Sequence, residues 1–120
     1  HLKNISKHNK IKFYGWKNKN DIYKNSDIII ITGKTNNFPY VALEAKSYGI
    51  PVISCSRGDI KKIIKSNFDG FINHTNSSKT IINLINLISK KYSKFSKNSF
   101  LRSKLFEINS ACKKFWNNIL

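Results

Sequence analysis

The sequence predicts an α/β fold built on an open parallel sheet, and three features indicate it. The β-branched run 27–32 (DIIIIT) is typical of a strand covered on both faces, and the run 51–56 (PVISCS) is of the buried-strand type. Each run is followed by a segment whose apolar residues recur at helical spacing. With 120 residues, 40% of them hydrophobic, the chain can form one domain with a moderate core. We therefore expect strands that alternate with helices, followed by further helices.

The elements before the first long run are short. Residues 11–15 (IKFYG) are predicted to form a brief strand that ends in a glycine turn. After a loop, residues 21–25 are predicted to form a short helix capped by Asn20 or Asp21. The run 27–32 (DIIIIT) is then the first buried strand.

The central stretch, 35–55 (TNNFPYVALEAKSYGIPVISC), has the order loop, helix, turn and strand. Pro39 suits the first turn of the helix, where an N–H group is not needed, and Gly49 suits the position just past its end. The start of this helix offers unpaired N–H groups and the positive end of a dipole, so an anion such as a diphosphate fits there. Glu44, one turn further on, is placed to accept hydrogen bonds from sugar hydroxyls.

Helical spacing assigns two faces to this helix. We expect the first face to be buried and the second to line a cleft. The buried face is Val41, Ala45 and Tyr48, and the neighbouring stripe is Tyr40, Glu44 and Ser47.

The second half of the chain continues the alternation. Asp59 is expected to cap a helix over 60–66 that buries Ile60, Ile63 and Ile64, and the turn at 69–70 leads into a last strand, 71–73. A longer helix starts at Ser77 or Ser78, because apolar residues recur at helical spacing after it. Ligands of such sheets bind at the carboxyl ends of the strands, where loops 15–20, 33–38 and 56–59 should lie.

The net charge is +16, from 22 Lys and Arg against 6 Asp and Glu, and it attracts phosphates, nucleic acid or anionic lipid. Because Lys, Asn and Ile have A/T-rich codons, base composition is a competing explanation. Residues 90–104 mix cations with aromatics, which fits a membrane or nucleic-acid surface as well as a solvated helix face. A nucleic-acid-binding module stays open as an alternative, although the cations are spread along the whole chain. The two cysteines match no zinc spacing, and the histidines form no metal cluster.

The segment 26–64 (SDIIIITGKTNNFPYVALEAKSYGIPVISCSRGDIKKII) resembles the donor-binding half of the family 4 glycosyltransferases. These are retaining enzymes with a GT-B fold, in which two Rossmann-like domains face one another across a cleft. The likeness extends from about residue 11 to residue 72. It implies that residues 1–76 are the C-terminal half of a nucleotide-binding domain, a partial Rossmann-like parallel sheet, and that residues 77–120 are helices packed on it.

The resemblance also implies roles for individual residues. The family carries two Glu separated by seven residues, the second before Ala in a segment like LEA. Here the second is Glu44, which implies a contact with the ribose hydroxyls of the donor. The first falls on Asn36, a departure that keeps hydrogen bonding to the transferred sugar but brings no negative charge to a developing oxocarbenium ion. We therefore assign Asn36 as the catalytic position, with an inactive remnant as an alternative. The remaining donor-binding residues are Asn37, Phe38, Pro39, Tyr40 and Val41, with Gly15 and Trp16 beside the nucleobase.

The function that the resemblance implies is that of a glycosyltransferase fragment of hexosyltransferase type. It would bind a nucleotide diphosphate sugar for retaining transfer to a glycan or lipid-linked acceptor, in polysaccharide or glycolipid biosynthesis, with no cofactor and no metal. The resemblance places the acceptor-binding domain upstream of His1, so we expect the 120 residues alone to be inactive. The expected location is the cytoplasm, with a peripheral contact at the anionic inner face of the membrane.

Overall fold

The computed structural model describes residues 11–33, 40–75, 77–107 and 117–118. Its described residues contain a parallel sheet of three strands in the order β1 (Ile29–Ile31), β2 (Val52–Ser54) and β3 (Gly70–Ile72). Ile30 pairs with Ile53, and Ile53 pairs with Phe71. The predicted α/β class and the parallel pairing of the runs at 27–32 and 51–56 are thereby confirmed.

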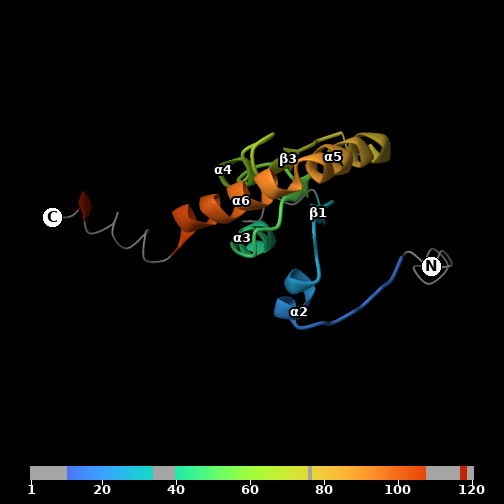
Figure 1. Ribbon diagram of the computed structural model, residues 1–120, viewed down its shortest axis with the longest axis horizontal. Helices are drawn as coiled ribbons and strands as arrows, with labels where there is room; N and C mark the ends of the chain where they lie inside the picture. Colours follow the sequence, from blue (N-terminus) through green and yellow to red (C-terminus); the bar gives the residue numbers. More distant parts are fainter. Residues whose placement is uncertain (1–10, 34–39, 76, 108–116, 119–120) are drawn as a thin grey trace.

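Helices cover both faces of the sheet. Successive residues of a strand point to opposite faces, so neighbouring residues of β2 enter two different cores. Val52 packs into a core with α3 (Tyr40–Ser47) and α4 (Ile60–Ile63), to which α2 (Lys19–Lys24) adds one tyrosine. Ile53 packs into a second core with α5 (Ser78–Lys90) and α6 (Tyr92–Ser103). A 3₁₀ turn, η1 (Lys104–Phe106), follows α6. Figure 1 shows α6 running across the molecule beside α3, with α2 set apart below them.

Several predicted features of the helices are confirmed. Gly49 follows α3 with a φ of +71°, a conformation that suits glycine. Ser77 caps α5 and accepts a hydrogen bond from the backbone N–H of Thr80. Ile60 and Ile63 of α4 are buried, as is the Ile64 that follows them, but the helix predicted over 60–66 ends at Ile63, because Ile64 has an extended backbone.

The predicted strand at 11–15 is wrong. This segment is extended coil with exposed side chains, because no strand of the described chain lies beside it to pair with its backbone.

The expectation that the run at 27–32 is covered on both faces is also only half right. Ile29 and Ile31 pack against the α3 core, but Ile30 is 40% exposed, because β1 forms an edge of the described sheet.

The predicted buried face of α3 is wrong in two of its three residues. The helix buries Ala42, Ala45 and Lys46, whereas Val41 and Tyr48 are exposed. Tertiary packing explains the difference. Because α3 packs both against the sheet core and against α6, its buried stripe is rotated toward the two alanines. Small side chains at that stripe allow close packing.

Two predicted helix caps are also corrected. Asn18 caps α2, in place of Asn20 or Asp21, and its side chain accepts a hydrogen bond from the Asn20 backbone N–H at 2.9 Å. Asp59 precedes α4 but makes no capping hydrogen bond. Its carboxylate instead lies 2.9 Å from Lys62 Nζ, one turn along the helix, because that side chain supplies a full charge within reach.

A buried ionic cluster joins α3 to α6. Lys46 Nζ donates to Asp69 Oδ2 and to the backbone carbonyl of Ile63, and both ionic side chains are fully buried. Arg102 Nε of α6 lies 2.8 Å from the same carboxylate oxygen, although the angle does not make a hydrogen bond. Burial lowers the pKa of Lys46, and its bond to Asp69 opposes that shift. The cluster fixes how α3, and hence Glu44, sits against the C-terminal helices.

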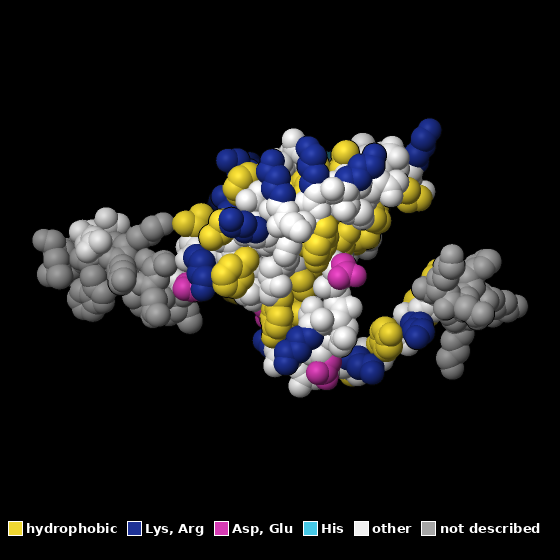
Figure 2. Space-filling model, in the orientation of Figure 1, with side chains coloured by type: hydrophobic (Ala, Val, Ile, Leu, Met, Phe, Trp, Pro, Cys, Tyr) yellow, Lys and Arg dark blue, Asp and Glu magenta, His cyan; other side chains and the backbone are white. Residues whose placement is uncertain are grey.

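The surface is strongly basic without a single basic stripe on the face drawn in Figure 2, where Lys and Arg side chains are scattered over several elements. This dispersal gives no support to a nucleic-acid groove, which requires cations gathered along one path. Within the described ranges, no helix is both long enough and apolar enough to cross a membrane.

Candidate functional site

Glu44 lies at the junction of α2 and α3, with both carboxylate oxygens engaged. Oε2 accepts a hydrogen bond from the Tyr23 hydroxyl at 3.0 Å, and Oε1 accepts one from Lys19 Nζ at 3.3 Å. Tyr23 is 7% exposed, whereas Lys19 is largely in solvent. The phenol is therefore the firmer of the two contacts, because an exposed ion pair contributes little.

A second tyrosine completes this junction. The rings of Tyr48 and Tyr23 stack with their centroids 5.3 Å apart, and the Tyr48 hydroxyl donates to Asn20 Oδ1 at 2.6 Å. Together with Lys19, Glu44 and Ser47, these residues line a cavity of about 170 Å³. A carboxylate, an amide and two phenols thus converge on one hollow, and such groups recognise the hydroxyls of a sugar.

The topology places the start of α3, one turn before Glu44, at the ligand edge of the sheet. Helix α3 starts after β1, so its N-terminus lies at the carboxyl ends of the parallel strands. Tyr40 and Val41 begin the helix with exposed side chains, 67% and 49% accessible. Glu44 follows one turn later, so an anion at the helix start would lie within about 6 Å of it along the axis.

The sequence-predicted site residues are only partly brought together. Glu44 and Ser47 line the cavity, and Tyr40 lies outside its wall. Gly15, with a φ of +61°, and the fully exposed Trp16 do not line it either. Four predicted residues lie outside the described part of the chain: Asn36, Asn37, Phe38 and Pro39.

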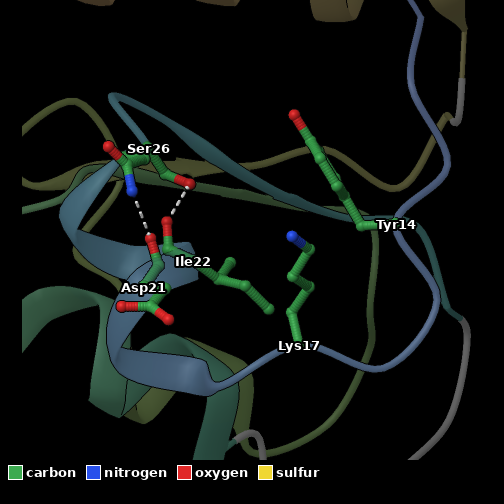
Figure 3. A pocket seen from close by; sticks show the side chains of 6 residues that line it. Tyr14, Lys17, Asp21, Ile22 and Ser26 are labelled. Atoms are coloured by element: carbon green, nitrogen blue, oxygen red, sulfur yellow. Dashed lines mark hydrogen bonds between the residues drawn. The ribbon is translucent and has the colours of Figure 1, made fainter.

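A separate cavity of about 370 Å³ lies between the extended segment before α2 and α2 itself (Figure 3). Tyr14 and Lys17 form the side of the segment, with Lys17 Nζ 5.1 Å from the centre of the Tyr14 ring, and Ile22 faces them from α2. It adjoins the predicted nucleobase position, but its aromatic wall is Tyr14, and Trp16 takes no part in it.

Sequence reasoning missed the partners of Glu44. Tyr23 and Lys19 precede it by 21 and 25 residues, and no local spacing rule connects such distant positions. The available signal was the short helix at 21–25, whose tyrosine could have been tested as a hydrogen-bond donor. Among the residues that the structure describes, no group of three or more His, Cys, Asp or Glu is placed to hold a metal ion.

The environment of Tyr23 leads to a pH-dependent prediction. Burial, and then the hydrogen bond and charge of Glu44, raise the pKa of Tyr23 to about 12. Because the folded-state pKa exceeds the unfolded value of about 10, this stabilisation is fully present below pH 10. It should be lost as the pH rises from about 10 to about 12. An absorbance titration of tyrosinate should contain a late component that Tyr23→Phe reduces, and the remainder belongs to Tyr92, whose pKa is also raised by burial.

Glu44→Gln is the control for the carboxylate contribution to that titration. It leaves Tyr23 buried but removes the negative charge, so the late component should move to lower pH and still remain above the ordinary tyrosine range. A late component that is unchanged by Glu44→Gln would contradict a phenol–carboxylate contact in solution.

Comparison with known proteins gives one family and several relatives. The family model described as glycosyl transferases group 1 matches residues 1–101. The UDP-Gal:alpha-D-GlcNAc-diphosphoundecaprenol alpha-1,3-galactosyltransferase of Escherichia coli is 33% identical over 70 residues, which are 58% of this chain and 18% of that protein. An uncharacterized glycosyltransferase of Haemophilus influenzae is 26% identical over 121 residues, covering 97% of this chain and 31% of that protein.

A solved structure shares the fold. HepE of Anabaena, crystallised in complex with UDP and glucose, superposes with a TM-score of 0.68 at 19% identity. The match covers 82% of this chain and 28% of that one. The chain thus spans less than a third of the length of each of these proteins.

Proposed function

This chain belongs to the glycosyl transferases group 1 family, and on that premise we propose that it carries part of the site that binds a nucleotide-activated sugar. The full protein would be a retaining transferase of the family 4 type with a GT-B fold. The observation that carries the proposal is the carboxylate of Glu44, held by Tyr23 and Lys19 one turn into a helix that starts at the ligand edge of the sheet.

In this proposal the donor diphosphate lies against the N-terminus of α3, and the ribose hydroxyls donate to Glu44. A carboxylate offers about four acceptor positions, so the bonds from Tyr23 and Lys19 leave room for two further donors. Tyr23 acts as a positioning residue, because its buried hydroxyl keeps the carboxylate in one orientation before the nucleotide arrives.

The chemistry we propose for the full protein is metal-independent transfer of a hexose. The diphosphate leaving group would be stabilised by the helix dipole and by cations, and Asn36 would hydrogen-bond the transferred sugar. A lipid-linked or glycan acceptor fits, because the Escherichia coli relative is named for a diphosphoundecaprenol acceptor. Such an acceptor would bring the full protein to the inner face of the membrane from the cytoplasm. The 120 residues alone should bind nucleotide but not transfer sugar.

Substitution of Glu44 tests the proposed donor site. Glu44→Ala should weaken binding of UDP about tenfold or more, because hydrogen bonds to a charged group contribute roughly 1.5–3 kcal/mol each. Inorganic pyrophosphate lacks the ribose, so its affinity should not change. Isothermal titration of the 120-residue chain, with and without a chelator, measures these affinities, and the chelator should have no effect.

A matched glutamate and a matched ligand sharpen that test. Glu107, which pairs with Lys104 at 2.8 Å beyond α6, supplies the control Glu107→Ala, and this variant should bind UDP like the unmodified chain. The unmodified chain should bind the 2′-deoxy analogue of UDP more weakly than UDP. The Glu44→Ala variant should bind the analogue and UDP with equal affinity. If Glu44→Ala and Glu107→Ala lower the UDP affinity equally, Glu44 is not a ribose ligand.

A further inference from the structure

A third cavity opens at the carboxyl ends of β2 and β3, and Glu44 does not line it. It has a volume of about 340 Å³ and is lined by Arg57, Gly58, Ile60, Lys61, Ile72 and His74. Arg57 and Gly58 follow β2, and His74 follows β3. Neighbouring parallel strands thus deliver these residues to the edge of the sheet where ligands bind.

The charges around this cavity have one sign. Its walls contain an arginine, a lysine and a histidine but no carboxylate. Asp59 lies between the lining residues along the chain, and its Oδ1 is already 2.9 Å from Lys62 Nζ. Arg57, Lys61 and His74 are exposed, whereas Ile60 and Ile72 supply an apolar wall. Such an arrangement attracts a small anion into a defined hollow.

One backbone feature supports an anion here. Gly58 has a φ of +86°, a conformation that glycine adopts without strain, and it leaves the loop backbone between Arg57 and the start of α4 uncovered by a side chain. An anion can therefore approach the backbone of this loop closely.

We propose that this cavity binds a phosphoryl group, with Arg57 and Lys61 as its charged ligands and His74 as a third donor. Arginine suits the role because its planar guanidinium matches two phosphate oxygens at once. The site shares no lining residue with the Glu44 cavity, so it would act on a phosphate other than the diphosphate of the bound nucleotide.

Chemical-shift titration of the ¹⁵N-labelled 120-residue chain with inorganic pyrophosphate tests this site. The amides of Gly58, Lys61 and His74 should shift. The double variant Arg57→Ala/Lys61→Ala should weaken pyrophosphate binding at this site about tenfold or more. The control Lys90→Ala/Lys94→Ala removes the same charge from α5 and α6 and should leave that affinity unchanged. Equal weakening by the two double variants would mean that only the net charge attracts the anion, and would overturn the proposal.

A competition experiment distinguishes the source of the phosphate. Pyrophosphate and glucose 1-phosphate should each still shift His74 when the chain is saturated with UDP, because the two cavities are separate. Loss of their binding in the presence of UDP would assign the cavity to the nucleotide site and overturn the proposal. Glu44→Ala should change UDP binding only. This site therefore stands or falls independently of the proposed donor site.

Discussion

Replacing Asp69 with alanine should lower the free energy of unfolding by about 3–5 kcal/mol, because it leaves buried charge without a partner. Lys46 is fully buried and donates to Asp69 and to one backbone carbonyl. Arg102 also faces the same carboxylate oxygen at 2.8 Å. Single domains are stable by only about 5–15 kcal/mol, so the loss would remove a large part of the total. Chemical denaturation followed by circular dichroism measures the difference.

Asp59→Ala is the matched control for this loss. Asp59 also pairs with a lysine, Lys62, but both side chains are well exposed, so we expect a loss below about 1 kcal/mol. If Asp69→Ala unfolds the chain outright, Lys46→Met/Asp69→Leu keeps the test open, because an apolar pair of similar volume should restore much of the stability. A loss for Asp69→Ala no larger than that for Asp59→Ala would contradict the buried cluster.

The loss of stability in the Asp69→Ala variant should depend on pH, and the direction of that dependence can be derived. Burial lowers the pKa of Lys46, and removing Asp69 removes the bond that opposes this shift. Below the ordinary lysine range the unfolded chain then binds more protons than the folded one, so stability rises with pH. The deficit of Asp69→Ala relative to the unmodified chain should therefore shrink as the pH increases toward that range.

The fold could be predicted where local pattern and burial agree. The run at 51–56 (PVISCS) is of the buried-strand type, and the structure buries all of β2, because helices cover both of its faces. The segment at 11–15 (IKFYG) is also predicted to be a strand but stays extended coil. A strand needs a neighbour to satisfy its backbone, and the neighbour is a property of the whole sheet that the local pattern does not contain.

The candidate site shows the same division. Glu44 could be found because it is the carboxylate within a recognisable loop and helix. Its partners Tyr23 and Lys19 could not, because they reach it from another helix. Lys46 was equally unpredictable: lysine is almost never fully buried unless paired, and its partner Asp69 is 23 residues away. Contacts of this kind depend on how helices pack, which helical periodicity alone does not determine.

Gly70→Ala should disrupt the sheet at the pairing of β2 with β3. A Cβ atom at Gly70 would lie 2.1 Å from the backbone carbonyl oxygen of Val52, its partner in the ladder. Backbone atoms cannot rotate away as a side chain does, so the strands must separate and lose ladder hydrogen bonds. We expect a loss of about 3 kcal/mol or more, at the upper end of the range for overpacking.

Gly33→Ala is the control for this substitution, and its expected effect has the opposite sign. A Cβ atom at Gly33 meets nothing within 4 Å, and its φ lies outside the left-handed region. Alanine there restricts the unfolded chain, so stability should stay equal or rise by up to about 1 kcal/mol. Denaturation of both variants measures the contrast. Because β3 leads directly to His74, Gly70→Ala should also weaken pyrophosphate binding at the cavity lined by Arg57, Lys61 and His74. Gly33→Ala should leave that binding unchanged. Equal stability of the two variants would show that β2 and β3 do not pair in this register in solution.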